Sequence, residues 1–173
     1  MYPSSRSKKG TAAMGLRLTN AADYAILAMI HMACLPDGAV ALRTEIAQAY
    51  SIPPSFMAKI LRALVRAELL RSTRGVHGGF SLARPATEIT LLDVVEAIEG
   101  PLALTGCMDG ESDGCEWSAE CPAHPVWARV QDKMTEILRG STLEMLVSSR
   151  RRNGRVLFMA QQPEPVARTK AKE

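Results

Sequence analysis

The chain has 173 residues, of which 47% are hydrophobic and 5% aromatic, and it carries a formal net charge of +3. The hydrophobic share excludes a wholly disordered chain, and the many Ala, Leu, Met and Arg residues favour helices over a β-sandwich. No apolar stretch is long enough to span a membrane, and residues 1–10 lack the apolar core of a secretory signal. We therefore expect a cytoplasmic protein with no membrane partner, in which the four cysteines serve as thiols or metal ligands.

The charges are segregated along the chain. Residues 53–85 contain six Lys or Arg and one acid, Glu68, whereas residues 86–125 contain nine acids and neither Lys nor Arg. The chain is basic again after Leu146. The small net charge is thus a sum of opposite blocks, and the first basic block is a candidate binding surface for a polyanion.

The first predicted element is a helix that follows a flexible leader over residues 1–16. Thr19 or Asn20 is a suitable N-cap, and apolar residues recur at helical spacing until about Cys34. We expect Cys34 to be a small core residue on this helix. A turn that contains proline and glycine then separates it from a short second helix over residues 44–50.

A third helix is predicted from Ser55, its N-cap, to about Glu68, after a break at Pro53-Pro54. One face of this helix is apolar and the other is polar or basic. The apolar face holds Met57, Ile60, Leu61, Leu64 and Val65. The other face holds Ser55, Lys59, Arg62 and Arg66, at offsets of four, seven and eleven residues from Ser55. A short helix, a tight turn and a basic amphipathic helix form a helix-turn-helix.

A β-hairpin and a further helix complete the predicted DNA-binding unit, residues 17–100. A strand over residues 69–73, a glycine-rich loop and a return strand over residues 80–82 form a wing directly after the third helix. Thr90 caps the next helix, which ends at Gly100.

Three segments are predicted after residue 100. Residues 101–125 show no convincing period and contain three cysteines, so we expect a loop. Residues 126–149 are helical, with an interruption at Gly140 and a restart at a capping box that begins at Ser141. Residues 150–173 are expected to form a disordered basic tail. The fold class is therefore mainly α, a winged helix-turn-helix with a β-hairpin wing and a long C-terminal helix.

The basic helix and the wing have the features of a nucleic-acid interface. A B-DNA major groove accepts one α-helix, whose exposed side chains bond to base edges and phosphates. The candidate contacts are Ser55, Lys59, Arg62 and Arg66 on the helix, and Arg74 and His77 on the wing. Arginine reads guanine through a bidentate pair, whereas Lys59 is expected to contact phosphate. The alternative is a solvated helix face, but the turn, the wing and the one-sided charge together favour DNA binding.

Three cysteines and a histidine in and beside the acidic segment form a candidate metal site. Cys107, Cys115, Cys121 and His124 have the spacing C-x7-C-x5-C-x2-H. Three thiolates and one imidazole bind zinc tetrahedrally or hold an iron–sulfur cluster, and the spacing alone leaves these two nearly equal. The remaining alternative is three unpaired thiols in a surface loop.

Several short motifs resemble the Rrf2 family of bacterial winged helix-turn-helix regulators. They are Arg17-Leu18-Thr19, Asp23-Tyr24-Ala25, and Arg74-Gly75 with Gly78-Gly79-Phe80. The stretch from Cys121 to Trp127 resembles the C-x-x-H-x-x-W signature of the IscR branch, whose members regulate iron–sulfur cluster assembly. Thr142–Val147 resembles the segment that closes the long helix of that branch, and the resemblance covers about residues 14–150.

This resemblance implies a cofactor and two partners. It implies a 2Fe–2S cluster on Cys107, Cys115, Cys121 and His124, and a homodimer formed by the long helix near residues 126–147. It also implies a double-stranded, pseudo-palindromic DNA operator that two recognition helices read in successive major grooves. Transcription of iron–sulfur assembly or iron homeostasis genes would then respond to cluster occupancy.

Two departures from the IscR pattern leave alternatives open. The first cysteine spacing is seven residues, where five is usual, and seven resembles the RirA iron-response branch, which holds 4Fe–4S. In the nitric-oxide-sensing NsrR branch an Asp on the first helix of the partner subunit completes the site, and Asp23 occupies the matching position. Asp23 equally suits the first turn of a helix. Ala58-Lys59 stands where IscR-like recognition helices carry Glu-Gln, so the operator sequence is not predicted.

The predicted function is a transcriptional regulator whose DNA affinity is switched by an iron–sulfur cluster. The alternatives are a nitric-oxide-sensing repressor of the same family and a zinc-stabilised DNA-binding module without sensing. An enzyme with a catalytic cysteine is disfavoured, because no Cys–His pair lies on a strand-turn-helix frame.

Overall fold

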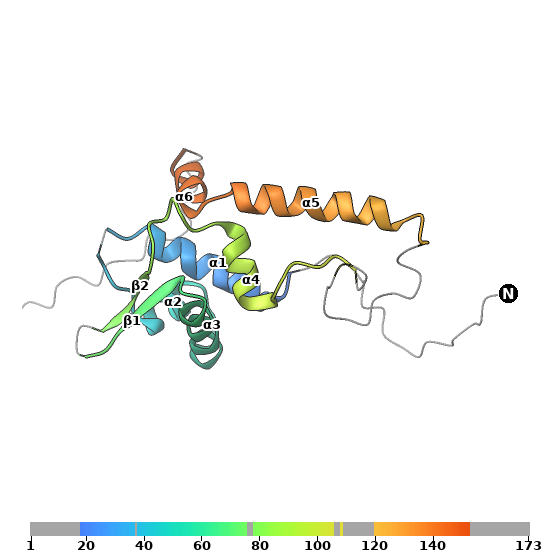
Figure 1. Cartoon of the computed structure of the whole chain (residues 1–173). Helices are drawn as coiled ribbons and strands as arrows, with labels where there is room; N and C mark the ends of the chain where they lie inside the picture. The colour runs from blue at the N-terminus through green and yellow to red at the C-terminus, as the bar shows by residue number, and fades with distance from the viewer. Residues whose placement is uncertain (1–17, 37, 76–77, 106–107, 109–119, 153–173) are drawn as a thin grey trace, which may run out of the picture.

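The computed structural model describes residues 18–36, 38–75, 78–105, 108 and 120–152. Within them the chain forms helices and one antiparallel hairpin (Figure 1). The elements are α1 (Asn20–Ala33), α2 (Arg43–Ala49), α3 (Pro54–Arg66), β1 (Leu70–Thr73), β2 (Gly79–Leu82), α4 (Leu91–Glu99), α5 (His124–Gly140) and α6 (Leu143–Arg152). This order confirms the predicted fold class, a mainly helical winged helix-turn-helix. The described helices include none with the length and apolarity needed to cross a bilayer.

Some predictions fall on residues outside these ranges. They concern the leader over residues 1–16, His77, Cys107, Cys115 and the tail from residue 153. The start of the predicted tail is described, and there the structure differs from the expectation, because α6 continues through Arg152.

Helix α1 begins where the sequence predicts, but the predicted environment of Cys34 at its end is wrong. The Thr19 hydroxyl oxygen accepts a hydrogen bond from the Ala22 amide at 3.3 Å, which makes Thr19 the N-cap. Cys34 is the C-cap residue and its side chain is exposed, so the expectation of a core cysteine is wrong. The apolar stripe of α1 ends at Met32, and the chain leaves the core at the cap.

The core lies among α1, α2, α3, α4 and the first turn of α6. Four of the five predicted apolar residues of α3 are buried, and Val65 is half-buried. The helix starts at Pro54 and not at a Ser55 cap, because proline suits the first helical position, whose amide lacks an intrahelical partner. Thr90 caps α4 as predicted, in a reciprocal pair of hydrogen bonds with Asp93 at 2.8 and 3.1 Å.

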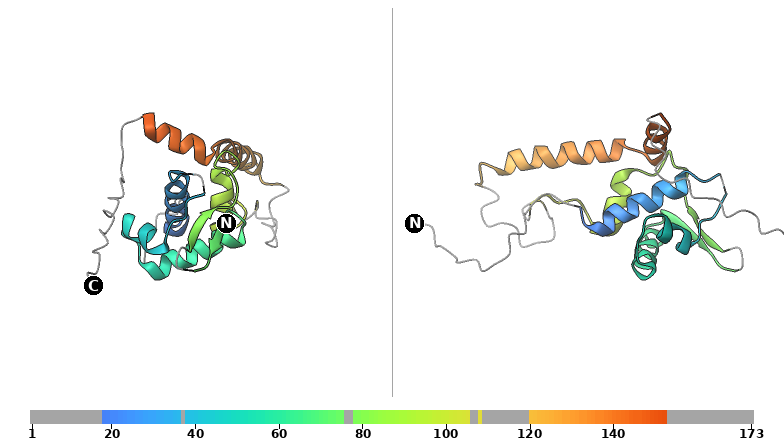
Figure 2. Two further views of the ribbon diagram at one scale, coloured as in Figure 1. Left: turned by 90° about the vertical axis from the view of Figure 1, so that its left-hand side faces the viewer. Right: turned by 180° about the vertical axis from the view of Figure 1, so that it is seen from behind.

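The region predicted as an interrupted helix over residues 126–149 forms two separate helices, α5 and α6. Helix α5 ends at Gly140, the predicted interruption, and has no buried residue. Beyond its contact with α4 it extends away from the remaining elements, as Figure 1 and the right-hand view of Figure 2 show. The residue that caps α6 is Thr142, whose hydroxyl oxygen accepts from the Met145 amide at 3.3 Å, and not Ser141 as predicted. The reason is that Thr142 pairs with Thr90 in a β-bridge, which holds this segment extended.

Candidate nucleic-acid interface and cysteine segment

A tight turn between α2 and α3 orients the candidate recognition helix. Ser51 adopts a left-handed backbone conformation with φ of 53°, and the Ile52 amide donates to the Ala47 carbonyl at 2.9 Å. The Ile52 side chain is buried in the core. This anchored turn and the buried stripe of α3 leave the basic face of α3 directed outward.

The predicted contact residues on α3 share one exposed face. Ser55, Lys59, Arg62 and Arg66 are all exposed. The Arg62 Nε–H donates to the Ala58 carbonyl at 3.1 Å, which holds the guanidinium against its own helix. The two terminal nitrogens of Arg62 have no hydrogen bond to another described residue in this arrangement, so they are available to a base edge or a phosphate.

The wing is fixed next to α3 by backbone bonds. Phe80 and Ala41 exchange hydrogen bonds at 2.8 and 2.9 Å, so β2 pairs with the segment that leads into α2. A Cβ at Gly78 would lie 2.4 Å from the Thr73 carbonyl oxygen, and one at Gly79 would lie 2.7 Å from the Ala41 carbonyl oxygen. These two glycines therefore permit close backbone contacts within the chain.

An open groove of about 510 Å³ separates α2, α3 and the hairpin. Its lining residues are Leu42, Arg43, Thr44, Ala58, Arg62, Ser72, Thr73, Gly78, Gly79 and Phe80. Arg62 thus lies opposite the polar side chains of β1, and Arg74 is exposed directly after that strand.

Arg43 is a candidate contact residue that the sequence analysis missed. It is exposed at the first position of α2 and lines the same groove as Arg62. Arg43 precedes both the predicted start of the second helix at Thr44 and the basic block that begins at residue 53, so neither pattern contains it. Arg84 lies in a different environment, with its guanidinium 3.8 Å from the Asp93 carboxylate at the start of α4.

Two of the four predicted metal ligands lie together at the far end of α5. Cys121 is half-buried, and its carbonyl accepts from the His124 amide at 3.1 Å, so both residues belong to the turn that starts the helix. Cys107 and Cys115 lie outside the described residues, and within the described ones no three candidate ligands come together. A thiol and an imidazole on one turn are a donor pair that suits a soft metal or an iron–sulfur cluster.

Asp23 lies elsewhere, exposed on the first turn of α1. It has no hydrogen bond or ion pair to another described side chain. Its position leaves both interpretations open, the first-turn acid and the ligand donated to a partner subunit.

Comparisons with known proteins agree with this arrangement. Residues 18–149 match the family Rrf2, which is described as an iron-dependent transcriptional regulator. The chain belongs to the Rrf2 family. As an Rrf2 transcriptional regulator it stands among DNA-binding proteins and not among enzymes.

Relatives and solved structures support the same placement. Protein aau3 of Rhizobium meliloti (strain 1021) is 34% identical over 152 residues, 87% of this chain and 96% of that protein. A putative HTH-type transcriptional regulator of Mycobacterium tuberculosis (strain CDC 1551 / Oshkosh) is 37% identical over 74% of this chain and 79% of its own. The structure of CymR, the global cysteine regulator of B. subtilis, superposes with a TM-score of 0.65 at 26% identity, over 78% of this chain and 98% of CymR. T. potens IscR shares the fold, with a TM-score of 0.64 at 23% identity over 83% and 94% of the two chains.

Proposed function

We propose that this Rrf2 regulator binds operator DNA as a homodimer and that an iron–sulfur cluster on Cys107, Cys115, Cys121 and His124 switches its affinity. The observation that carries the proposal is the Cys121–His124 turn at the exposed end of α5, a helix whose other end joins the DNA-binding core. The family description as iron-dependent supports an iron-containing signal.

The DNA-binding part of the proposal assigns distinct tasks to the basic side chains. Arg62, tethered through Nε, presents its terminal nitrogens for bidentate contact with a guanine in the major groove. Ser55, Lys59 and Arg66 extend the contact along the same face, where phosphates and base edges are within reach of a docked helix. Arg74 and His77 of the wing contact the neighbouring backbone or minor groove, and Arg43 adds a phosphate contact from α2.

The dimer part of the proposal rests on the solvent-facing side of α5. Val126 and Ile137 are 60% and 65% exposed, and they line one mostly apolar groove with Val130 and Met134. This side of α5 faces away from its own protomer, and a second α5 covers its apolar area. Two recognition helices related by the dimer axis then read a pseudo-palindrome.

The cluster part of the proposal concerns which residues hold the metal. Cys121 and His124 supply two ligands from one turn, and the remaining two come from Cys107 and Cys115. A 2Fe–2S cluster is favoured and 4Fe–4S is the alternative, with Asp23 of the partner subunit as an alternative fourth ligand. When bound, the cluster supplies a group that responds to iron supply, oxidants or nitric oxide.

Helix α5 connects the ligand turn with the DNA-binding core. It has 17 residues, which is about 25 Å of helix, and the chain then enters α6, whose Leu143 and Val147 are buried. A cluster held by Cys121 and His124 at the start of α5 would change the pairing of the two α5 helices and with it the spacing of the recognition helices. Cluster occupancy alters DNA affinity only as far as the cluster prefers one of these dimer arrangements.

Anaerobic purification tests the proposal. We expect a coloured protein with iron and acid-labile sulfide, and an affinity for an operator selected from genomic fragments that changes when the cluster is removed. Cys121→Ser should abolish the colour, whereas Cys34→Ser, which changes an exposed cysteine at the end of α1, should leave it intact. A colourless protein with stoichiometric zinc, or DNA affinity that is equal with and without the cluster, would contradict the sensing proposal and favour the zinc-stabilised module.

The same preparation distinguishes nitric oxide from iron supply as the signal. Exposure to nitric oxide that alters DNA affinity more than iron limitation does would favour the nitric-oxide-sensing alternative. In that case Asp23→Asn should labilise the cluster more than His124→Ala does. If His124→Ala labilises the cluster more than Asp23→Asn does, and iron limitation has the larger effect on DNA affinity, the result supports His124 as the fourth ligand. It also supports regulation of iron–sulfur assembly or iron homeostasis genes.

A further inference from the structure

Ala58 places a methyl group on the outer face of α3, among polar and basic side chains. It is three residues from Ser55 and four from Arg62, so the three residues lie on one side of the helix. Ala58 is half-buried and stands outside the buried stripe of α3. It lines the groove between α2, α3 and the hairpin. A methyl group forms no hydrogen bond with a phosphate or a base edge, so this position differs in chemistry from its neighbours.

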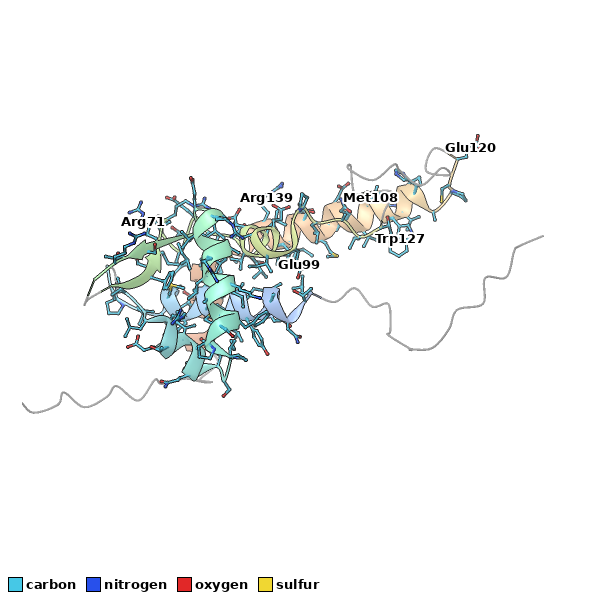
Figure 3. All side chains as sticks on the ribbon, turned by 90° about the horizontal axis from the view of Figure 1, so that it is seen from below. Arg71, Glu99, Met108, Glu120, Trp127 and Arg139 are labelled. Carbon is cyan, nitrogen blue, oxygen red and sulfur yellow. The ribbon has the colours of Figure 1, made fainter. Side chains whose placement is uncertain are left out.

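The side chain of Arg62 is held next to Ala58. The Arg62 Nε–H donates to the Ala58 carbonyl at 3.1 Å, so the guanidinium folds back along the helix by about one turn. Both residues line the same groove, none of whose lining residues is acidic. In Figure 3 the helix α3 lies in front, with the hairpin that carries Arg71 beside it. The groove therefore presents hydrogen-bond donors and a methyl group side by side.

Two stacked bases in the major groove match this pair of groups. Guanine offers two acceptors, N7 and O6, and thymine alone among the four bases offers an apolar group, its C5 methyl. Neighbouring bases of one strand are about 3.4 Å apart along the duplex. Ala58 and Arg62 are about 6 Å apart along the helix axis, but the bond through Nε brings the guanidinium back toward Ala58. The two groups thus have the spacing to contact adjacent bases.

We propose that Ala58 is a specificity-determining residue, which packs against the C5 methyl group of a thymine next to the guanine that Arg62 reads. This inference rests on the docking of α3 proposed above and names a second base of the operator. Burial of one methyl group corresponds to about a 4-fold change in affinity. Cytosine lacks this methyl group, so the contact discriminates between the two pyrimidines. Deoxyribose also carries apolar C–H groups, but it is present at every position of the duplex.

The experiment uses the full chain and an operator selected from genomic fragments. In one half-site each thymine is replaced in turn by deoxyuridine, which lacks only the C5 methyl group. Each guanine is replaced in turn by 7-deazaguanine, which lacks the N7 acceptor. Fluorescence anisotropy measures the affinities of the unsubstituted protein, Ala58→Gly, Ala63→Gly and Arg62→Ala.

The glycine variants form a matched pair. Ala58→Gly removes the methyl group and keeps the backbone carbonyl to which Arg62 is bonded. Ala63→Gly changes another half-buried alanine of α3 that does not line the groove. Both variants carry the same cost of a glycine inside a helix, and the ratio of affinities for two duplexes cancels that cost.

We expect one thymine whose replacement by deoxyuridine weakens binding about 4-fold in the unsubstituted protein and in Ala63→Gly. The same replacement should have no effect in Ala58→Gly. This thymine should be adjacent to the guanine whose replacement by 7-deazaguanine has no effect in Arg62→Ala.

Three results would overturn the assignment. The first is a deoxyuridine effect that is the same in Ala58→Gly as in the unsubstituted protein at every thymine. The second is an operator with no thymine beside the guanine that Arg62 reads. The third is a set of deoxyuridine duplexes that bind like the operator while Ala58→Gly weakens operator and random duplex alike, which would identify a deoxyribose contact. An unsubstituted protein that binds operator and random duplex equally would overturn base reading by α3 altogether, and that measurement precedes every substitution.

Discussion

Replacement of Arg62 by alanine tests whether α3 reads bases. Arg62 lines the groove between α2, α3 and the hairpin, and its Nε is bonded to the Ala58 carbonyl at 3.1 Å. A bidentate arginine–guanine contact provides about 1–3 kcal/mol of discrimination between bases. Arg62→Ala should therefore weaken binding to a selected operator about 5- to 150-fold. Binding to a random duplex of the same length should weaken much less.

Fluorescence anisotropy with both duplexes, titrated at several salt concentrations, separates base contacts from phosphate contacts. Loss of one phosphate contact lowers the slope of log affinity against log salt by about 0.9 and weakens both duplexes alike. We expect that pattern for Arg66→Ala. Arg139→Ala, which removes an exposed arginine near the end of α5, is the matched control and should change neither affinity appreciably. Equal weakening of both duplexes by Arg62→Ala would refute base reading, and no weakening would refute the assignment of α3 as the interface.

Three further predictions concern the packing and assembly of the protein. Leu143→Ala, at a fully buried position, should lower the free energy of unfolding by about 2–5 kcal/mol in urea, whereas Met145→Ala, 56% exposed, should change it by less than about 0.5 kcal/mol. Thr90→Ala should cost about 0.5–2 kcal/mol in the same assay, because it removes the side-chain cap of α4; a change near zero would mean that the cap is dispensable. Ile137→Glu should convert dimers into monomers in sedimentation experiments, since it introduces a charge into the apolar side of α5, and unchanged dimers would exclude that side as the interface.

The sequence predicts most of the fold because local signals and hydrophobic spacing agree there. Thr19 and Thr90 cap helices as expected, since the hydroxyl of an N-cap satisfies an amide within the same turn. The stripe of α3 and the hairpin after it are likewise local patterns, and the structure shows both. The errors lie where a distant partner decides the local conformation.

Residues 141 and 142 show how a distant partner overrides a local signal. Ser141 starts a sequence pattern typical of a capping box, yet the pairing of Thr142 with Thr90, 52 residues away, keeps this stretch extended and moves the cap by one residue. Cys34 shows the same limit, since its apolar neighbours suggested burial and only the end of α1 at Ala33 reveals that the side chain is exposed.

The candidate sites were predictable to different degrees. The basic face of α3 follows from spacing alone, but Arg43 joins it only through the packing of α2 and the hairpin around one groove. The sequence shows the four candidate metal ligands as three cysteines and one histidine close together in the chain. The structure adds that two of them, Cys121 and His124, lie on one helical turn.

The joint between α5 and the DNA-binding core consists of main-chain bonds. The Leu91 amide donates to the Ser141 carbonyl at 2.8 Å, and the Leu143 amide donates to the Ile89 carbonyl at 2.9 Å. Such bonds are available to every residue type except proline as donor, so they do not depend on which side chains the joint carries, apart from the buried Leu143. A scaffold built in this way can change the residues at the far end of its long helix without rebuilding the end that binds DNA.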